Sequence, residues 1–254
     1  MTTIDMRPFG DGVVLLELDK PPANAIDEHL LADLARVLAE VRDDAAVRAV
    51  VLGGAGAFFC AGFDFAAPRR DDEVALDLYK LYRDCHLALL TLSKPTIAMI
   101  NGHAIAGGFV LALACDHRIA AAGDYRIGMN EIAVGASFPR AAMEIVRLRL
   151  SHAQAAELVL GAGLLPASAA VTSGLASEIV AREALEPHVR ELAQRLAGMA
   201  RDAYVHTKLG LVAEAASRIE AETDDEALAT MAVWICDESR AARRRQRERL
   251  KVRA

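Results

Sequence analysis

The chain has 254 residues, of which 54% are hydrophobic and 25% charged, and it carries a formal net charge of −6. This composition excludes a disordered polar chain, and the acidic balance gives no reason to expect a nucleic acid as a partner. The four cysteines have neither a metal-ligand spacing nor a paired pattern, so we expect no metal site and small buried thiols in the reducing environment of the cytoplasm. The longest apolar-plus-glycine run, residues 104–115, is too short to span a bilayer, so no membrane partner is expected.

Strands and helices alternate through the first part of the chain. The β-branched runs at residues 13–18 and 47–52 are typical of strands, and the first begins so early that no secretory leader is expected. Asp27 can cap a helix between them, because apolar residues recur at helical spacing after it. A longer helical pattern covers residues 73–92 and precedes a β-rich run at 95–100. This alternation predicts a layered α/β core.

Two adjacent glycines, Gly107 and Gly108, open an apolar segment that predicts a buried helix over residues 107–115. Glycine at a helix start lets a ligand approach the backbone closely, and the first helical amides lie unpaired at the positive end of the helix dipole. Such a place can bind an anion, or stabilise an oxyanion that forms during a reaction. The alternative is that the glycines serve only the close packing of a helix against a strand.

Beyond this helix the pattern changes from mixed to helical. Short strands are predicted near residues 117–121 and 125–127, and after Gly135 the pattern is almost wholly helical. Ser151 and Gln154 have the spacing of a capping box, which predicts a helix beginning there.

From Glu183 onward the chain is expected to contain three helices, separated by breaks near residues 201–202 and 223–225. No linker divides the chain, so we expect a core at residues 1–195 and a helical region at 196–254. Residues 240–254 hold eight Lys and Arg against one Glu. This basic end is either the solvated end of a helix or an electrostatic aid for an anionic ligand.

Three more segments form, with the glycine pair, a characteristic succession of motifs along the chain. An Asn-Ala pair at 24–25 follows two prolines, residues 58–64 form a strand that runs into a turn, and residues 128–131 read Gly-Met-Asn-Glu. Together with the glycines at 107–108, this order resembles the crotonase superfamily, the enoyl-CoA hydratases and isomerases, over roughly residues 13–180. The resemblance implies an α/β fold of successive β-β-α units wound into a spiral, followed by a C-terminal helical region. It also implies an acyl-CoA thioester as substrate, no cofactor apart from the CoA of that substrate, and a homotrimer or a dimer of trimers.

Glu131 is the expected catalytic base. Taken alone, a Glu between a strand and a helix is usually a surface carboxylate, but its neighbours here are apolar. Burial raises the pKa of a carboxyl group, which suits a general base working near neutral pH. The Asn130-Glu131 pair is similar to the Δ3,Δ2-enoyl-CoA isomerase branch of the family, and this likeness implies the catalytic role.

The resemblance also implies which residues bind substrate. The backbone N–H groups of Phe63 and Gly107 match the family's oxyanion hole, which would hold the thioester oxygen. Ala106 stands where a third glycine is frequent in the family, a change that need not disturb the amide of Gly107. The residues expected to contact substrate or CoA are Ala25, Ala61, Asp64, Phe65, Ile105 and Gly108.

Val110 decides between the two reactions of the family. The hydratases use two glutamates, and the first would fall at position 110, where valine can neither position a water nor transfer a proton. Isomerisation needs one base, which takes a proton from C2 and returns it to C4. The sequence therefore favours an enoyl-CoA isomerase, with an enoyl-CoA hydratase and a non-catalytic acyl-CoA-binding protein as alternatives.

Four other polar residues are considered, two of them with alternative roles. His103 either faces the pocket or is packed and hydrogen-bonded, and Arg140 is either exposed or a polar element of the acyl channel. We expect local backbone hydrogen bonds at Asp116. Asp64 follows the oxyanion turn and is expected to be structural as well as close to CoA.

Overall fold

Two sheets organise the protein, for which a computed structural model describes residues 2–64 and 72–253. The larger sheet has six strands in the order β1-β2-β3-β5-β7-β10. Their bounds are Ile4–Gly10, Val13–Leu18, Ala49–Gly54, Thr96–Ile100, His117–Ala121 and Glu178–Val180. All neighbours in this sheet run parallel except β1 and β2. The expected strands at 13–18, 47–52, 95–100 and 117–121 are confirmed as β2, β3, β5 and β7.

The smaller sheet contains β4 (Phe58–Cys60), β6 (His103–Ile105), β8 (Arg126–Gly128) and β9 (Leu164–Pro166), in that order. β4, β6 and β8 are parallel neighbours, and β9 is antiparallel to β8. The carboxyl ends of three neighbouring strands therefore lie along one edge of this sheet.

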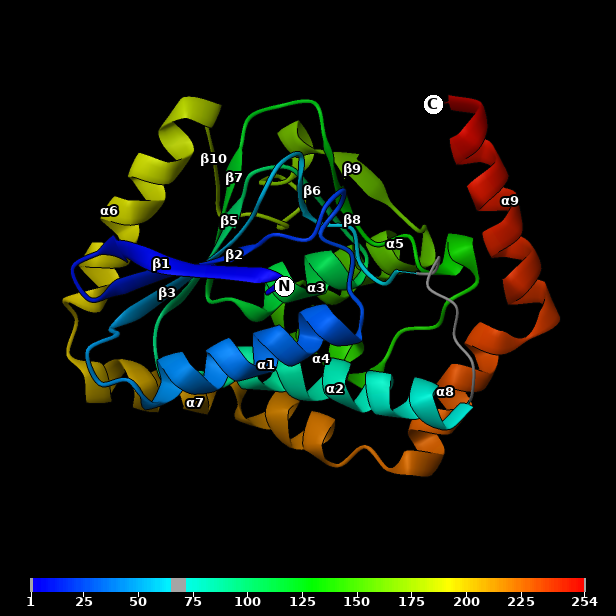
Figure 1. Ribbon diagram of the computed structural model, residues 1–254, viewed down its shortest axis with the longest axis horizontal. Coiled ribbons are helices and arrows are strands. Elements are labelled where there is room, and N and C mark those ends of the chain that lie inside the picture. Colours follow the sequence, from blue (N-terminus) through cyan, green and yellow to red (C-terminus); the bar gives the residue numbers. More distant parts are fainter. Residues whose placement is uncertain (1, 65–71, 254) are drawn as a thin grey trace.

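Helices surround both sheets (Figure 1). In chain order they are α1 (Glu28–Asp43), α2 (Asp72–Leu90), α3 (Gly107–Ala114), α4 (Arg140–Arg149), α5 (His152–Leu160), α6 (Leu185–Ala197), α7 (Arg201–Glu220), α8 (Asp224–Ile235) and α9 (Asp237–Arg253). Short 3-10 turns occur at η1 (Ile132–Val134), η2 (Ala167–Ala169) and η3 (Arg182–Ala184). α6 lies at one end of the molecule and the basic helix α9 at the other (Figure 1).

The core forms because the larger sheet is covered on both faces. On one face, Leu15, Val51 and Ile97 pack with Val189 and Ala193 of α6. On the other face, the sheet packs against α1 to α4, and α3 is buried on every side. Buried parallel strands need continuous apolar sequence, which explains why β3 and β5 have no exposed residue.

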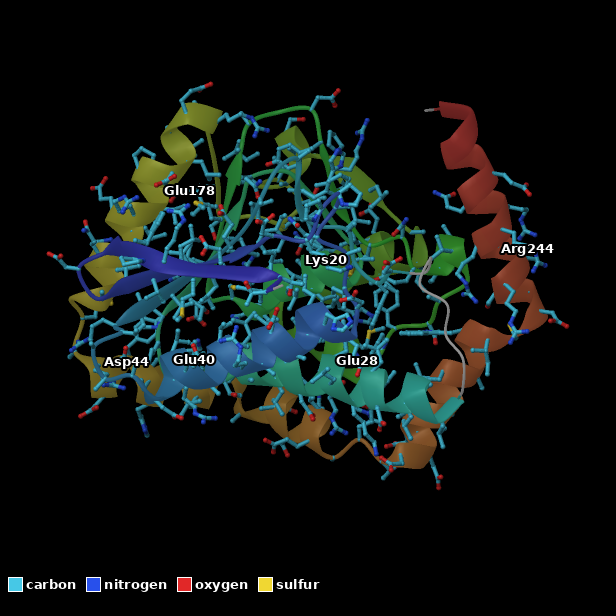
Figure 2. All side chains as sticks on the ribbon, viewed as in Figure 1. Lys20, Glu28, Glu40, Asp44, Glu178 and Arg244 are labelled. Atoms are coloured by element: carbon cyan, nitrogen blue, oxygen red, sulfur yellow. The ribbon has the colours of Figure 1, made fainter. Side chains whose placement is uncertain are left out.

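The charged side chains of Glu28, Glu40 and Arg244 are exposed on the outside of these layers (Figure 2). Among the described residues, no helix combines the length and apolar composition needed to cross a bilayer.

Four expectations about particular elements can be checked. Asp27 caps α1 by accepting a hydrogen bond from the amide of Leu30, and Ser151 with Gln154 forms the capping box of α5, so both caps are confirmed. The expectation of three C-terminal helices is wrong, because the chain turns at Cys236 and separates α8 from α9. Cys236 is also exposed, whereas Cys60, Cys85 and Cys115 are buried as expected.

Candidate active site

A cavity of about 630 Å³ lies at the edge where β4, β6 and β8 end. The loops after these strands contribute Ala61, Phe63, Gly107, Asn130 and Glu131 to its lining. Tyr82 of α2 and Trp234, Arg243 and Gln246 of the last two helices complete much of the wall. The cavity therefore lies between the smaller sheet and the end of the molecule that α8 and α9 form (Figure 1).

The two amides expected to form an oxyanion hole are brought together. Gly107 is the first residue of α3, where an N–H has no partner within its own helix. Among the described residues, it has no backbone acceptor elsewhere either. A Cβ added to Gly62, which has a φ of +77°, would lie only 3.1 Å from the Gly107 nitrogen. The turn that carries Phe63 therefore packs directly on the start of α3, and glycine permits this approach.

The N-terminal loop fixes the direction of the Phe63 amide. Ile26 forms a parallel bridge with Phe63, in which the amide of Ile26 donates to the Gly62 carbonyl and the amide of Asp64 donates to the Ile26 carbonyl, both at 2.8 Å. Because N–H groups alternate in direction along an extended strand, this pattern turns the N–H of Phe63 away from Ile26.

Asn24 holds this N-terminal loop against β4. Its side chain is buried, its amide group donates to the Phe58 carbonyl at 2.8 Å and to the Ala55 carbonyl at 3.1 Å, and its Oδ1 accepts from the amide of Lys20. The Asn-Ala pair of the sequence therefore acts mainly through the asparagine, which ties together the segments before and after the larger sheet's third strand.

Glu131 lies in the loop after β8, with its side chain in the cavity wall. The residue is 8% exposed, and its Oε2 has no hydrogen-bond partner among the described residues. Burial raises the pKa of Glu131 from its usual value near 4.5 to about 8. The Glu131 carbonyl accepts hydrogen bonds from the amides of Val134 and Ala136, which fixes the backbone of this residue at the start of η1. Glu131 is thus a buried carboxyl group with one oxygen, Oε2, left without a partner among the described residues, and its proton affinity suits proton transfer near neutral pH.

Ala106 shows backbone strain at the same site. Its φ of +53° and ψ of −133° lie in a region that favours glycine. Strain of this kind costs about 1–3 kcal/mol and must be offset by the surrounding structure. The amide of Ala106 donates to the Gly128 carbonyl at 2.8 Å, and its carbonyl accepts from Phe109 and Val110 at the start of α3. Ala106 therefore connects the start of α3 to β8, the strand that precedes Glu131.

The expected substrate contacts fall into three groups. Ala61 and Ile105 line the cavity, whereas Ala25, Asp64 and Gly108 are not in its wall. A Cβ on Gly108 would lie 2.3 Å from the Cys60 carbonyl oxygen, so close packing against β4 explains this glycine. Phe65 lies outside the described residues.

The carbonyl oxygen of Ala25 accepts a hydrogen bond from the ammonium group of Lys20 at 3.0 Å. The same ammonium group lies 3.0 Å from Asp27 and 4.0 Å from Asp64. Asp64 therefore forms a small charged cluster with Lys20 and Asp27 beside the N-terminal loop. Its backbone amide also donates to the Ile26 carbonyl.

The other polar candidates are placed as follows. His103 lines the cavity and is also packed, because its ring stacks on Phe58 and its Nδ1 accepts from the amide of Arg126. Arg140 pairs with Glu226 at 2.6 Å and does not line the cavity.

The contacts of Asp116 extend beyond the local backbone hydrogen bonds expected from the sequence. Its carboxylate accepts from the nearby amide of Thr96, but also from Lys208 at 2.9 Å and from Tyr204 at 3.1 Å, both on α7. Lys208 is buried, so this ion pair joins α7 to the sheet rather than serving the cavity.

Tyr82 and Trp234 are two cavity residues that the sequence analysis missed. Both belong to helices whose apolar spacing is explained by core packing, so no pattern distinguishes them from ordinary core residues. Phe63 connects them, because its ring stacks on Tyr82 at 4.8 Å and meets the Trp234 ring edge-on at 5.3 Å.

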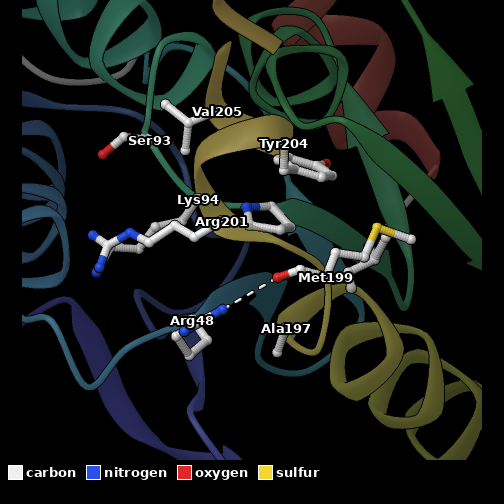
Figure 3. A pocket seen from close by; sticks show the side chains of 10 residues that line it. Arg48, Ser93, Lys94, Ala197, Met199, Arg201, Tyr204 and Val205 are labelled. Carbon is white, nitrogen blue, oxygen red and sulfur yellow. Dashed lines mark hydrogen bonds between the residues drawn. The ribbon is translucent and has the colours of Figure 1, made fainter. Parts of the chain in front are cut away.

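A second hollow lies between the loop after α6 and the start of β5 (Figure 3). Arg48 donates to the Met199 carbonyl at 3.2 Å across it, and Lys94 donates to the Val47 carbonyl at 2.8 Å. Its volume of about 10 Å³ has room for at most one water molecule, so it cannot hold an acyl-CoA. Within the described parts of the chain, no cluster of three or more His, Cys, Asp or Glu is arranged to hold a metal ion.

Comparisons with known proteins agree with this geometry. A model of the enoyl-CoA hydratase/isomerase family matches residues 9–252, and the chain belongs to this family. An (E)-benzylidenesuccinyl-CoA hydratase of Thauera aromatica is 33% identical over 190 residues, which cover 74% of each protein. The predicted superfamily is therefore confirmed, and the protein is an acyl-CoA enzyme whose particular reaction these names leave open.

Solved structures confirm the fold. An apo enoyl-CoA isomerase of Mycobacterium tuberculosis superposes with a TM-score of 0.81 and 30% identity, over 90% of this chain and 98% of that chain. Human mitochondrial Δ3-Δ2-enoyl-CoA isomerase superposes with a TM-score of 0.90 and 24% identity over 99% of both chains, which shows the same fold. The expected crotonase-like α/β architecture with C-terminal helices is confirmed.

The raised pKa of Glu131 predicts a pH-dependent stability. A carboxyl group whose folded pKa lies near 8 and whose unfolded pKa lies near 4.5 stabilises the fold below pH 4.5, and this contribution is lost as the pH rises through 8. Relative to Glu131→Gln, the wild type should therefore lose stability between these pH values, by about 5 kcal/mol at most. Urea unfolding of both proteins at pH 5 and pH 9 measures this difference. Equal pH dependence in the two proteins would show that Glu131 is not buried as described.

The strain at Ala106 predicts that Ala106→Gly stabilises the protein. Relief of strain should exceed the extra entropy of glycine in the unfolded chain, for a net gain of about 1 kcal/mol. The matched control is Ala104→Gly on β6, a buried alanine without positive φ, which should lose stability. Chemical denaturation of both variants gives the comparison, and a loss of stability in Ala106→Gly would contradict the strain argument.

Proposed function

We propose that the protein isomerises a 3-enoyl-CoA to a 2-enoyl-CoA, with Glu131 as the single base. The observation that carries the proposal is a buried carboxyl group, with no partner for Oε2 among the described residues, in the same cavity as the Phe63 turn and the Gly107 helix start. Val110, on the first turn of α3, is fully buried and supplies no second carboxylate. One base and two amide donors are enough for a proton shift.

The proposed reaction uses these groups in order. The carboxylate of Glu131 takes a proton from C2, and negative charge develops on the thioester oxygen as the double bond moves from C3 to C2. The N–H groups of Phe63 and Gly107 donate hydrogen bonds to this oxygen, each worth about 3–4 kcal/mol of transition-state stabilisation. Glu131 then returns the proton to C4, so that no proton is gained or lost overall.

Hydration is the second candidate, because a relative at 33% identity is named as a hydratase. It would require Glu131 to activate a water and another group to position it, and Val110 cannot be that group. A non-catalytic acyl-CoA-binding protein is the third candidate, but a carboxyl group with a pKa of about 8 in the cavity wall favours an enzyme.

We further propose that the CoA part lies over the loops at Ala25 and Ala61 and near Asp64, with Ile105 adjacent. Arg126 and Arg243 in the cavity wall supply positive charge that suits the phosphates of CoA.

An oligomer, a homotrimer or two stacked trimers, also belongs to the proposal. Residues 1–195 would form most of the acyl-CoA-binding core and 196–254 the oligomerisation region, whose Trp234 and Arg243 also complete the cavity wall. Exposed apolar side chains on α7 and α8, Leu211, Leu228 and Val233, support an interface in this region.

The two reactions can be separated at position 110. The wild type should isomerise a 3-enoyl-CoA faster than it hydrates a 2-enoyl-CoA, and Glu131→Gln should lower isomerisation at least about 100-fold. Val110→Glu should raise the ratio of hydration to isomerisation, because it adds a carboxylate near the dipole-positive start of α3, whereas Val110→Gln controls for shape. Product analysis with both thioesters gives the ratio. A wild type that hydrates as fast as it isomerises would contradict the one-carboxylate proposal and favour the hydratase.

A further inference from the structure

The side-chain hydroxyl of Tyr82 lies at the cavity proposed for the acyl group and has no hydrogen-bond partner among the described residues. Tyr82 is 1% exposed and lines the cavity. Its ring contacts the rings of Phe63 and His86, and its backbone carbonyl accepts a hydrogen bond from Nδ1 of His86. Its hydroxyl makes no hydrogen bond with any described residue. This hydroxyl is not among the fully buried polar atoms that lack a partner, so it reaches the cavity and is open to a ligand there.

The position of this hydroxyl is fixed by its surroundings. The ring of Tyr82 lies between the rings of Phe63, at 4.8 Å, and His86, at 3.8 Å. A Cβ added to Gly107 would lie 3.1 Å from Cε2 of Tyr82 and 3.4 Å from its hydroxyl oxygen. The hydroxyl end of the ring therefore faces the start of α3, beside the expected oxyanion hole.

The hydroxyl stays a proton donor at neutral pH. Burial, and then the nearby negative charge of Glu131, raise the pKa of Tyr82 well above its usual value. Burial also lowers the pKa of His86 to about 4, partly opposed by its bonds to backbone, so the neighbouring ring is uncharged. A neutral donor in a dry, aromatic wall recognises a hydrogen-bond acceptor on a ligand.

We propose that Tyr82 donates a hydrogen bond to an oxygen on the acyl chain, so that the site selects acyl-CoA thioesters with a hydroxyl, carbonyl or carboxylate oxygen over plain hydrocarbon chains. This rests on the proposed function, which places the acyl group of a CoA thioester in this cavity. A hydrocarbon chain leaves the hydroxyl buried and unpaired, whereas an oxygen-bearing chain pairs it. Sites that hydrogen-bond a substrate oxygen reject analogues that lack it.

Tyr79 provides a matched control one turn earlier on α2. It is equally buried, at 1% exposed, but its hydroxyl donates to Glu222 at 2.7 Å and accepts from the amide of Arg140 at 3.3 Å. The hydrogen bonds of this hydroxyl are made within the protein, and Tyr79 does not line the cavity. Tyr79→Phe should therefore lower stability and leave ligand preference unchanged. Tyr82→Phe should instead leave stability unchanged and alter ligand preference.

The test measures binding, which needs no turnover. Trp234 is the single tryptophan of the chain and lines the cavity, so its fluorescence reports ligand binding. Titrations use butyryl-CoA, 3-hydroxybutyryl-CoA and 4-hydroxybutyryl-CoA in the Glu131→Gln background, which prevents conversion of the ligands. With Tyr82 present, at least one hydroxylated thioester should bind about 10-fold more tightly than butyryl-CoA. Adding Tyr82→Phe should reduce this ratio to about one without loss of stability, and adding Tyr79→Phe should keep the ratio.

Two outcomes would overturn the proposal. An unchanged ratio in Tyr82→Phe would show that the hydroxyl does not contact the acyl chain. An equal weakening of all three ligands would assign it to the thioester group that they share. Failure of all three thioesters to bind would instead contradict the proposed function itself, while binding without isomerase activity in the wild type would contradict the reaction and leave the Tyr82 proposal standing.

Discussion

The site depends on the parallel alignment of β4, β6 and β8 in the smaller sheet. Phe63 follows the end of β4, Gly107 follows the end of β6 and Glu131 follows the end of β8, each within three residues. Parallel neighbours end at the same edge, so these three residues meet although they are far apart in the sequence. The close contacts at Gly62 and Gly108 keep α3 against β4, which sets the distance between the two amides. The larger sheet and its helices hold this edge in place.

Two features of this edge oppose folding stability. Within the part of the chain that the structure describes, Glu131 is buried without a partner for Oε2, and Ala106 adopts a conformation that favours glycine. Each is unfavourable for the folded state by itself, and both lie in the cavity wall. Strain and unpaired polar groups concentrate where binding or catalysis requires them, because the rest of the structure can offset their cost. The hydroxyl of Tyr82, which has no hydrogen-bond partner among the described residues, faces the same cavity.

Local chemistry made much of the fold predictable. Asp27 and the Ser151–Gln154 pair are capping signals that act within one helical turn. The buried strands are predictable because their sequence is continuously apolar. β1 was not predicted, because as an edge strand it contains charged residues, Pro8 and exposed positions. The break at Cys236 was not predicted either, because no glycine or proline marks it. The burial of Glu131 was predicted from its apolar neighbours, whereas Tyr82 could be placed only once α2 was positioned against α3.

Exchange of the C2 protons of a bound acyl-CoA with deuterated water tests the central claim most directly, because it isolates the step that Glu131 and the two amides would perform. We expect the wild type to exchange the C2 protons of a saturated acyl-CoA, as observed by NMR, with a rate that increases with pH as Glu131 ionises near pH 8. Glu131→Gln should abolish this exchange while it still binds the thioester. Exchange at the wild-type rate in the Gln variant would contradict the account.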